Sequence, residues 1–422
     1  MVHHKISKNT SNSLFDSIKV VPQMFKFKHY QTTLEDLPFP FIPGSSNYFN
    51  NLQFYWDSYF IMLGLMYEDE EAKLLAKGMI ENFHYLFKKF NFIPNSYPRD
   101  TTRTQPPLLT SMILLIHKHF NDKNWLEEMY QFAKAEYFEV WMREPRLITD
   151  IGLSRYFDPI HPLGIHQNAE DESGWDFTPR FEEKCDECIA IDLNSLLYKY
   201  ENDLQHIAEY LNFHKDMKFF IIQKANRKKL IDFYLYNSED KLFYDYNFKE
   251  KKQLQIKTLA TFFPLFANLA TFKQAQNIVD QLYLFEHKYG LVTCDSIYGY
   301  HNKQWNYPNG WAPLQYIVIQ GLKNYGFFEE AQRISLKWLS LNSQNYFQSG
   351  GNWEEKYVVI DNKLLQKENL KRIDDSRYEH QNKLFWSKGV FISLYKELEE
   401  DISKKLSKIT SSPIKRRSFP FF

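Results

Sequence analysis

Two acidic segments of this 422-residue chain hold side chains that could do acid–base chemistry. The first, DESGWDFTPRF at 171–181, places Asp176 between Trp175 and Phe177. A carboxyl group between two rings is partly desolvated, which raises its pKa, as a general acid working near neutral pH requires. Asp176 is therefore a candidate proton donor. The same local sequence also allows Asp176 to cap a helix or to pair with Arg180.

The second segment, QSGGNWEEKYVVID at 348–361, offers Glu354 and Glu355 after two glycines and beside Trp353. Inverting glycoside hydrolysis uses a second carboxylate at about 6.5–9.5 Å from the acid, so that a water molecule fits between the two groups. Charge patterning alone, however, favours a solvated helix start for this EEK sequence. Either glutamate is a candidate base at this point.

Helices must position these segments, because apolar residues recur at helical spacing along most of the chain and strand-like alternation is scarce. No short repeat is visible, so the pattern predicts a large closed all-α array rather than a solenoid. The segments between the helices are rich in Pro, Gly, Asn, Trp and Tyr, and long loops on rigid scaffolds usually carry function. The predicted helices span 55–67, 71–90, 107–120, 124–139, 191–211, 215–235, 257–271, 273–287, 312–324, 327–341 and 386–407.

The chain shows no clear linker between domains. We therefore expect an N-terminal arm at 1–38, a single catalytic domain at 39–405 and a flexible C-terminal tail at 406–422.

Composition narrows the function classes. Lys plus Arg and Asp plus Glu both number 52, while aromatic residues reach 18%. Rings without a basic excess suit a neutral sugar better than nucleic acid or an anionic membrane. The three cysteines are too few for a disulfide framework, and Cys185 and Cys188 are expected to be plain helix residues rather than metal ligands. With no apolar run typical of a signal peptide or a membrane span, we expect a cytoplasmic protein.

Several loop motifs together resemble the trehalase family. QWNYPNGWAPLQ is similar to the second trehalase signature, FYWDSYFIMLGL to the end of the first, and IPNSYPRDTTRTQPP to the IPN segment of the family. ESGWDF and CIAIDLNSLLY then match the family's acid loop and the helix after it. The resemblance runs from about residue 39 to about residue 395 and implies an (α/α)6 barrel. The five motifs lie at 304–315, 54–65, 93–107, 172–177 and 188–198.

The resemblance also implies an activity. It is the inverting hydrolysis of α,α-trehalose to two glucose molecules by a monomer without a cofactor or metal, with Asp176 as general acid and Glu355, in EKY, as general base. Glu354 remains the alternative base. By the same resemblance, the expected sugar-binding residues are Trp56, Asp57, Asn95, Arg103, Gln105, Trp305, Asn306 and Glu379. Without the family, Trp56 and Trp305 are equally typical of core packing.

The chain departs from the family around this pocket. PGSSNYFNNLQF at 43–54 lacks the arginine of the first signature, and His166 or Gln167 stands near the place of a second arginine. Asn306 replaces an aspartate. DDSRYEH at 374–380 replaces a glycine-rich lid, with Arg377 or Glu379 expected near the lid glutamate. Each lost charge-assisted hydrogen bond represents about 1.5–3 kcal/mol. Two alternatives therefore stay open: hydrolysis of another small α-glucoside, and a degenerate barrel that binds sugar without turnover.

Overall fold

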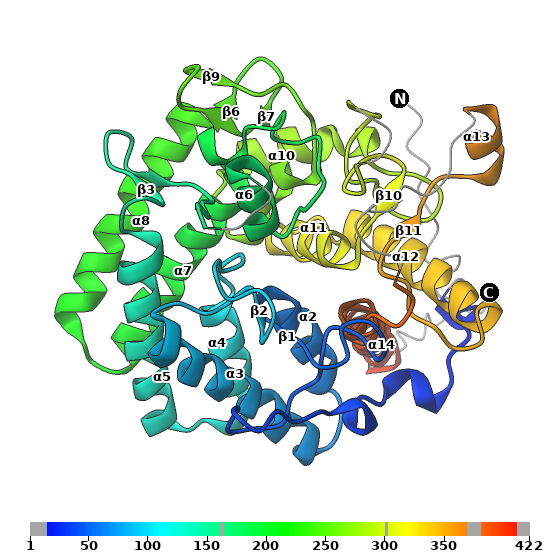
Figure 1. Ribbon diagram of the computed structural model, residues 1–422. Helices are drawn as coiled ribbons and strands as arrows, with labels where there is room; N and C mark the ends of the chain where they lie inside the picture. The colour runs from blue at the N-terminus through cyan, green and yellow to red at the C-terminus, as the bar shows by residue number, and fades with distance from the viewer. Residues whose placement is uncertain (1–14, 161–163, 300–302, 369–380, 412–422) are drawn as a thin grey trace, which may run out of the picture.

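The computed structural model describes residues 15–160, 164–299, 303–368 and 381–411. Within these residues an inner ring of helices is closed, because each helix contacts the next and the last contacts the first (Figure 1). The predicted closed all-α array is confirmed. The inner helices are α2 (Tyr55–Leu65), α4 (Leu109–Phe120), α7 (Ile191–Tyr210), α9 (Phe263–Phe266), α11 (Ala312–Asn324) and α14 (Phe385–Ser411).

A second set of helices packs outside this ring. α3 contacts α2 and α4, α5 contacts α4 and α7, α8 contacts α7, and α12 contacts both α11 and α14. Each outer helix thus covers one or two inner ones. These helices are α3 (Glu70–Phe90), α5 (Lys123–Glu136), α8 (His214–Tyr234) and α12 (Phe328–Gln348), and α10 (Phe272–Asp280) packs against β7 (Leu242–Phe243).

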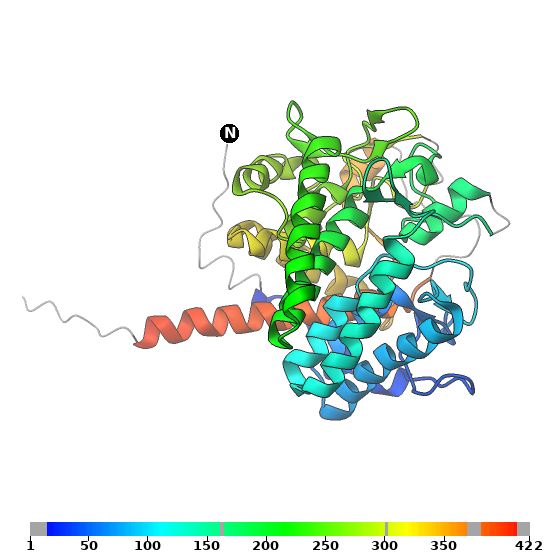
Figure 2. The ribbon, with the colours of Figure 1, turned by 90° about the vertical axis from the view of Figure 1, so that its left-hand side faces the viewer.

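The described part of the N-terminal segment lies against the barrel. Its 3-10 helix η1 (Pro22–Phe25) contacts α14, and Met24 and Phe27 are fully buried in the core. Residues 15–38 therefore contribute apolar surface to the outside of α14. Figure 2 shows the C-terminal end of α14 extending beyond the rest of the molecule.

α2 and α14 approach each other closely where two glycines meet. A Cβ atom added at Gly64 of α2 would lie 2.9 Å from the Cα of Gly389. One added at Gly389 of α14 would lie 2.0 Å from the carbonyl oxygen of Phe60. Only the missing side chains allow this contact, so the glycine pair closes the ring.

Short antiparallel strand pairs fasten the loops between the helices. β1 (Gln53–Phe54) pairs with β2 (Ser96–Tyr97), and β10 (Asn309–Gly310) pairs with β11 (Tyr357–Val358). These two pairs join segments far apart in the sequence. β3 (Leu147–Ile148) pairs with β4 (Leu153–Ser154), and β6 (Tyr236–Asn237) pairs with β7. β8 (Tyr246–Asn247) lies between β5 (Cys188–Ile189) and β9 (Lys252–Gln253) and pairs with both.

Some predicted elements are wrong. The helix expected at 257–271 is a 3-10 turn, η5 (Leu259–Phe262), followed by the single-turn α9, and the chain then leaves helical geometry at Asn268, whose φ is 55°. The Cys185–Cys188 segment is a 3-10 turn that leads into β5 rather than an α-helix.

Two helices were not predicted. α6 (Ile165–Ser173) buries mainly polar side chains, among them Asn168, Glu170 and Glu172, so it has no apolar stripe to detect. α13 (Asn362–Lys367) buries no residue at all. No helix in the described parts of the chain has the length and apolar character needed to cross a membrane.

Candidate active site

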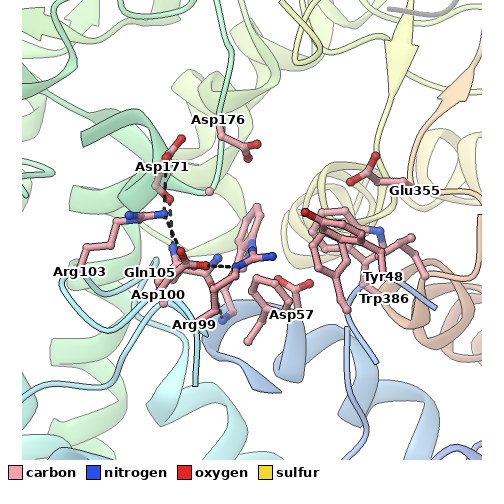
Figure 3. A pocket seen from close by; sticks show the side chains of 16 residues that line it. Tyr48, Asp57, Arg99, Asp100, Arg103, Gln105, Asp171, Asp176, Glu355 and Trp386 are labelled. Carbon is pink, nitrogen blue, oxygen red and sulfur yellow. Dashed lines mark hydrogen bonds and ion pairs between the residues drawn. The ribbon is translucent and has the colours of Figure 1, made fainter. Parts of the chain in front are cut away.

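A pocket of about 290 Å³ opens where the loops of the barrel meet. Figure 3 shows side chains from several loops converging on it, with acidic groups on both sides. Carboxylates, amides, two arginines and aromatic rings together are the side chains that bind neutral sugars. The lining residues are Tyr48, Phe49, Phe54, Trp56, Asp57, Asn95, Arg99, Asp100, Arg103, Gln105, Asp171, Gly174, Asp176, Glu355, Leu384 and Trp386.

The first turn of α2 contributes Trp56 and Asp57. The β1–β2 pair holds the 95–105 loop against this turn, and the backbone amide of Trp56 donates a hydrogen bond to Oε1 of Gln105 at 3.0 Å. Gln105 therefore caps the start of α2 while it lines the pocket. Trp56, Asp57 and Gln105 line the same pocket as Asn95 and Arg103.

Asp57 is a buried carboxyl group among other acids. Burial raises its pKa well above the usual value, and the charges of Asp176 and Glu355 raise the pKa further. The three carboxyl groups thus interact electrostatically within one pocket. A raised pKa favours the protonated form of Asp57, which can donate a hydrogen bond as well as accept one.

Arg103 lines the pocket and is held there by aspartates. Its side chain is 5% exposed, and its Nη2 lies 3.4 Å from Oδ1 of Asp100 and 3.5 Å from Oδ2 of Asp171. Its Nη1 lies 3.8 Å from Oδ2 of the buried Asp158. Asn95 also contacts Asp171, because its Nδ2 donates to the carbonyl of that residue at 3.1 Å. The three carboxylates fix the guanidinium group at the edge of the pocket, where it can donate to a sugar hydroxyl.

The acid segment begins where α6 ends. Gly174 adopts the left-handed conformation, with φ of 74°, and a Cβ atom there would lie 2.9 Å from the ring of Trp56. Trp175 is fully buried, and its ring packs against Trp305 with 5.3 Å between ring centres. The chain then turns so that Asp176 lines the pocket.

Arg180 does not serve as the partner of Asp176. Its guanidinium group is fully buried and donates to both Asp192 and Asp245, at distances of 2.7–2.9 Å. Oδ2 of Asp176 instead accepts a hydrogen bond from Nε2 of Gln304 at 2.9 Å. The alternative in which Asp176 pairs with Arg180 is therefore wrong, and the arginine anchors the acid segment to α7.

The β10–β11 pair brings the second acidic segment beside the first. Glu355, which precedes β11, is 3% exposed, and its Oε2 accepts a hydrogen bond from Nζ of Lys356 at 2.7 Å. Glu354 is not among the residues that line the pocket; its backbone amide donates to the hydroxyl of Tyr357, and its carbonyl accepts from Ser387. Of the two candidate bases, Glu355 alone lines the pocket.

Two predicted sugar-binding residues lie outside the pocket lining. Trp305 is fully buried, and its ring stacks on that of Trp311 with 3.8 Å between ring centres. Its ring centre lies 6.1 Å from that of Trp56, which lines the pocket. Asn306 is also buried: its Nδ2 donates to the carbonyl of Tyr298, and its Oδ1 accepts from the amide of Tyr307. Both side chains therefore stabilise the loop that precedes β10. Glu379 and Arg377 fall outside the described residues.

The structure adds pocket residues that sequence reasoning missed: Tyr48, Arg99, Asp100, Asp171 and Trp386. Most of them lie inside segments already singled out, so the signal was their type and position in those segments. Trp386 begins the last inner helix much as Trp56 begins the first.

His166 and Gln167, the two residues expected near the place of the second family arginine, make contacts beside the pocket. Gln167 donates to Oδ1 of Asp171 at 3.1 Å and so orients a pocket residue, while His166 pairs with Asp186. Neither lines the pocket directly.

Comparison with known proteins shows which family the chain resembles. The family model described as Trehalase matches residues 3–170 and 162–399. The cytosolic neutral trehalase of Kluyveromyces lactis is 34% identical over 396 residues, which cover 76% of this chain and 51% of that protein. The corresponding enzyme of Saccharomyces cerevisiae is 31% identical over 406 residues, covering 78% and 52%. The chain thus spans about half the length of the curated relatives it matches.

Comparison with solved structures points to the same family. The neutral trehalase from Saccharomyces cerevisiae superposes with a TM-score of 0.73 at 26% identity, covering 90% of this chain and 78% of that one. A GH63 mannosylglycerate hydrolase from Thermus thermophilus in complex with glucose matches in fold alone, with a TM-score of 0.62 at 15% identity and coverage of 85% and 95%. The predicted (α/α)6 barrel is confirmed. With its motifs gathered at one pocket of this barrel, the chain belongs to the trehalase family.

Proposed function

We propose that this chain is a cytoplasmic inverting glycoside hydrolase that cleaves α,α-trehalose, with Asp176 as general acid and Glu355 as general base. The observation that carries the proposal is the placement of these two carboxyl groups. They project into one pocket from separate loops, on opposite sides of the space that Asp57 and Arg103 border (Figure 3). The cytosolic names of the relatives support the location.

The reaction follows from the roles of the two groups. Asp176 donates its proton to the glycosidic oxygen as the bond from that oxygen to the anomeric carbon breaks. Glu355 removes a proton from a water molecule, whose oxygen attacks the anomeric carbon from the opposite face. One glucose therefore leaves in the α configuration and the other is released as β-glucose.

Substrate binding uses the rest of the pocket. Asp57, Asn95, Arg103 and Gln105 present donors and acceptors for hydroxyl groups, and the ring of Trp56 can cover an apolar sugar face. Carboxyl groups outnumber arginines in the lining, which favours a neutral substrate over an anion. The proposed active unit is a monomer.

The proposal is tested with purified protein and trehalose by following the anomeric proton signals at early times. Equal initial amounts of α- and β-glucose are expected, while release of α-glucose alone would contradict inversion. Asp176→Asn and Glu355→Gln are each expected to lower kcat by about 10²–10⁴-fold, the usual contribution of a general acid or base. Glu354→Gln is the matched control and should retain activity. Full activity in Asp176→Asn would overturn the acid assignment.

A second candidate function rests on Arg99. Its guanidinium group stands 5.2 Å from the ring centre of Phe49, with 43% of its side chain exposed at the pocket. An exposed cation at this place could bind a polar aglycone in a different small α-glucoside. A panel of α-glucosides separates the two functions: a response to trehalose alone excludes this alternative, and binding of trehalose without release of glucose would indicate a barrel that has lost turnover.

A further inference from the structure

Two buried residues outside the pocket lining connect the proposed acid to the proposed base. Nε2 of Gln304 donates to Oδ2 of Asp176 at 2.9 Å, and Oε1 of the same amide accepts from Nζ of Lys356 at 2.9 Å. The Lys356 ammonium group also donates to Oε2 of Glu355 at 2.7 Å. Gln304 and Lys356 are both fully buried. We call this set of four residues the carboxyl relay.

Donor and acceptor chemistry fixes the direction of the relay. A lysine ammonium group has only donors, so the oxygen of the Gln304 amide must face Lys356 and its NH₂ group must face Asp176. A side chain at position 356 that can both donate and accept would not impose this orientation. The side-chain amide of Gln304 therefore cannot exchange the positions of its oxygen and nitrogen while Lys356 is in place.

The backbone holds the relay as one unit. The amide of Trp305 donates to the carbonyl of Phe177 at 3.3 Å, which ties the acid segment to the residue after Gln304. On the other side, Gly310 pairs with Tyr357 in the β10–β11 ladder, next to Lys356. The ammonium group lies 5.2 Å from the ring centre of Trp311, which favours a cation there.

Other charged groups face the same two carboxyls. Asp57 on α2 interacts electrostatically with both Asp176 and Glu355, and Glu170 on α6 interacts with Asp176, Asp171 and Lys303. Asp171 is in turn paired with Arg103. These groups stay unchanged in variants of the relay, so a difference between such variants reports on Gln304 and Lys356 themselves.

We infer that Gln304 and Lys356 are positioning residues that engage one oxygen of each catalytic carboxyl and couple the protonation of the acid to that of the base. The inference rests on the proposed function, because it assigns work to the same two carboxyl groups.

The test begins with the pH dependence of kcat/KM, whose two limbs report the ionisation of base and acid. Lys356→Gln removes the cation beside Glu355, and we expect the acidic limb to move up by about one pH unit or more. The alkaline limb should move up as well, because the Gln304 amide is no longer held with its NH₂ group toward Asp176. Lys356→Arg keeps the cation and is expected to restore the acidic limb.

Gln304→Met tests the coupling. It removes the donor to Asp176 and should move the alkaline limb up by itself. Adding Lys356→Gln to this variant should then leave the alkaline limb where it is, because the path between the two carboxyls is already broken. Lys337→Gln is the charge-matched control and should leave both limbs in place. Lys337 lies on the outer helix α12, and its ammonium group pairs with Glu286.

A purely structural role predicts a different outcome. A loss of rate at every pH with both limbs unmoved would overturn the inference, as would independent limb shifts that add in the double variant. If Lys356→Gln fails to fold, as judged by near-ultraviolet circular dichroism, Gln304→Met and Lys356→Arg still decide, because an unmoved alkaline limb in Gln304→Met contradicts the relay.

Failure of the proposed function is recognised separately. If the wild-type protein releases no glucose, the relay is tested by carbon-13 NMR titration of the carboxyl groups, with signals assigned through their loss in Asp176→Asn and Glu355→Gln. Higher titration midpoints for both groups in Lys356→Gln would support the relay without any activity. Unchanged midpoints would overturn it.

Discussion

Arg103→Lys removes the guanidinium fork of a buried residue that lines the pocket. The Nη2 of Arg103 lies near Asp100 and Asp171, and its Nη1 lies 3.8 Å from Oδ2 of Asp158. Lysine keeps the positive charge near these aspartates but replaces the planar fork with a single ammonium group. The variant therefore tests the donors rather than the charge.

The expected size of the effect follows from the donor count. Losing one charge-assisted hydrogen bond to a sugar hydroxyl corresponds to about 1.5–3 kcal/mol, or about 10- to 150-fold in kcat/KM. Because the sugar is held before and during the reaction, KM should rise more than kcat falls. The assay is glucose release over a range of trehalose concentrations, with thermal unfolding measured alongside.

Arg99→Lys provides the control, because Arg99 lines the same pocket but is 43% exposed and already paired with Asp100. Its kcat/KM should stay within about threefold of the parent, as expected for an exposed ion pair. An Arg103→Lys protein that unfolds at the normal temperature and keeps kcat/KM within that range would refute the reasoning. So would an equal loss in both variants.

Three further outcomes are expected. If Asp57 binds sugar as a protonated carboxyl, Asp57→Asn should keep KM within about fivefold while Asp57→Ala raises it about tenfold or more; equal losses would indicate a carboxylate that only accepts. Burial raises the pKa of Glu136 from 4.5 to about 7, so the folded state keeps a proton that the unfolded chain loses, and stability falls as pH rises through this window. Glu136→Gln should therefore be more stable than the parent by about 3 kcal/mol in urea unfolding at pH 8, with the difference vanishing near pH 4.5. Gly174→Ala should destabilise by about 1–3 kcal/mol through both its positive φ and the clash with Trp56. Gly326→Ala, with a φ of 83° and open space around it, should show the smaller cost of the backbone alone.

Much of the barrel could be predicted from sequence because its long helices alternate apolar and polar faces. The limit was reached at α6, whose buried face is made of Asn168, Glu170 and Glu172. A period of apolar residues cannot reveal a helix that buries carboxyl groups. These acids are stabilised by partners that only the fold supplies, such as the two hydrogen bonds from Arg146 to Glu172.

The site was partly predictable for a related reason. Family motifs singled out Asp176, Glu355, Trp56, Asp57, Asn95, Arg103 and Gln105, all of which line the pocket. They could not tell that Trp305 packs behind Trp56, because a tryptophan in a motif suits sugar stacking and core packing equally. Nor could they show that Gln304 meets Lys356, since 52 residues separate the two and the β10–β11 pairing alone brings them together.

The glycine contact between α2 and α14 has a consequence for how the protein is made. α2 is synthesised before α14, so the surface of Gly64 that meets α14 stays uncovered until Gly389 has been synthesised more than 300 residues later. Such long-range closure is slow, and apolar surface exposed in the meantime favours aggregation. Trp56 and Asp57 sit on this same helix. Nascent chains released before α14 emerges should therefore depend on chaperones and lack sugar binding, so that a working pocket appears only when synthesis of the barrel is finished.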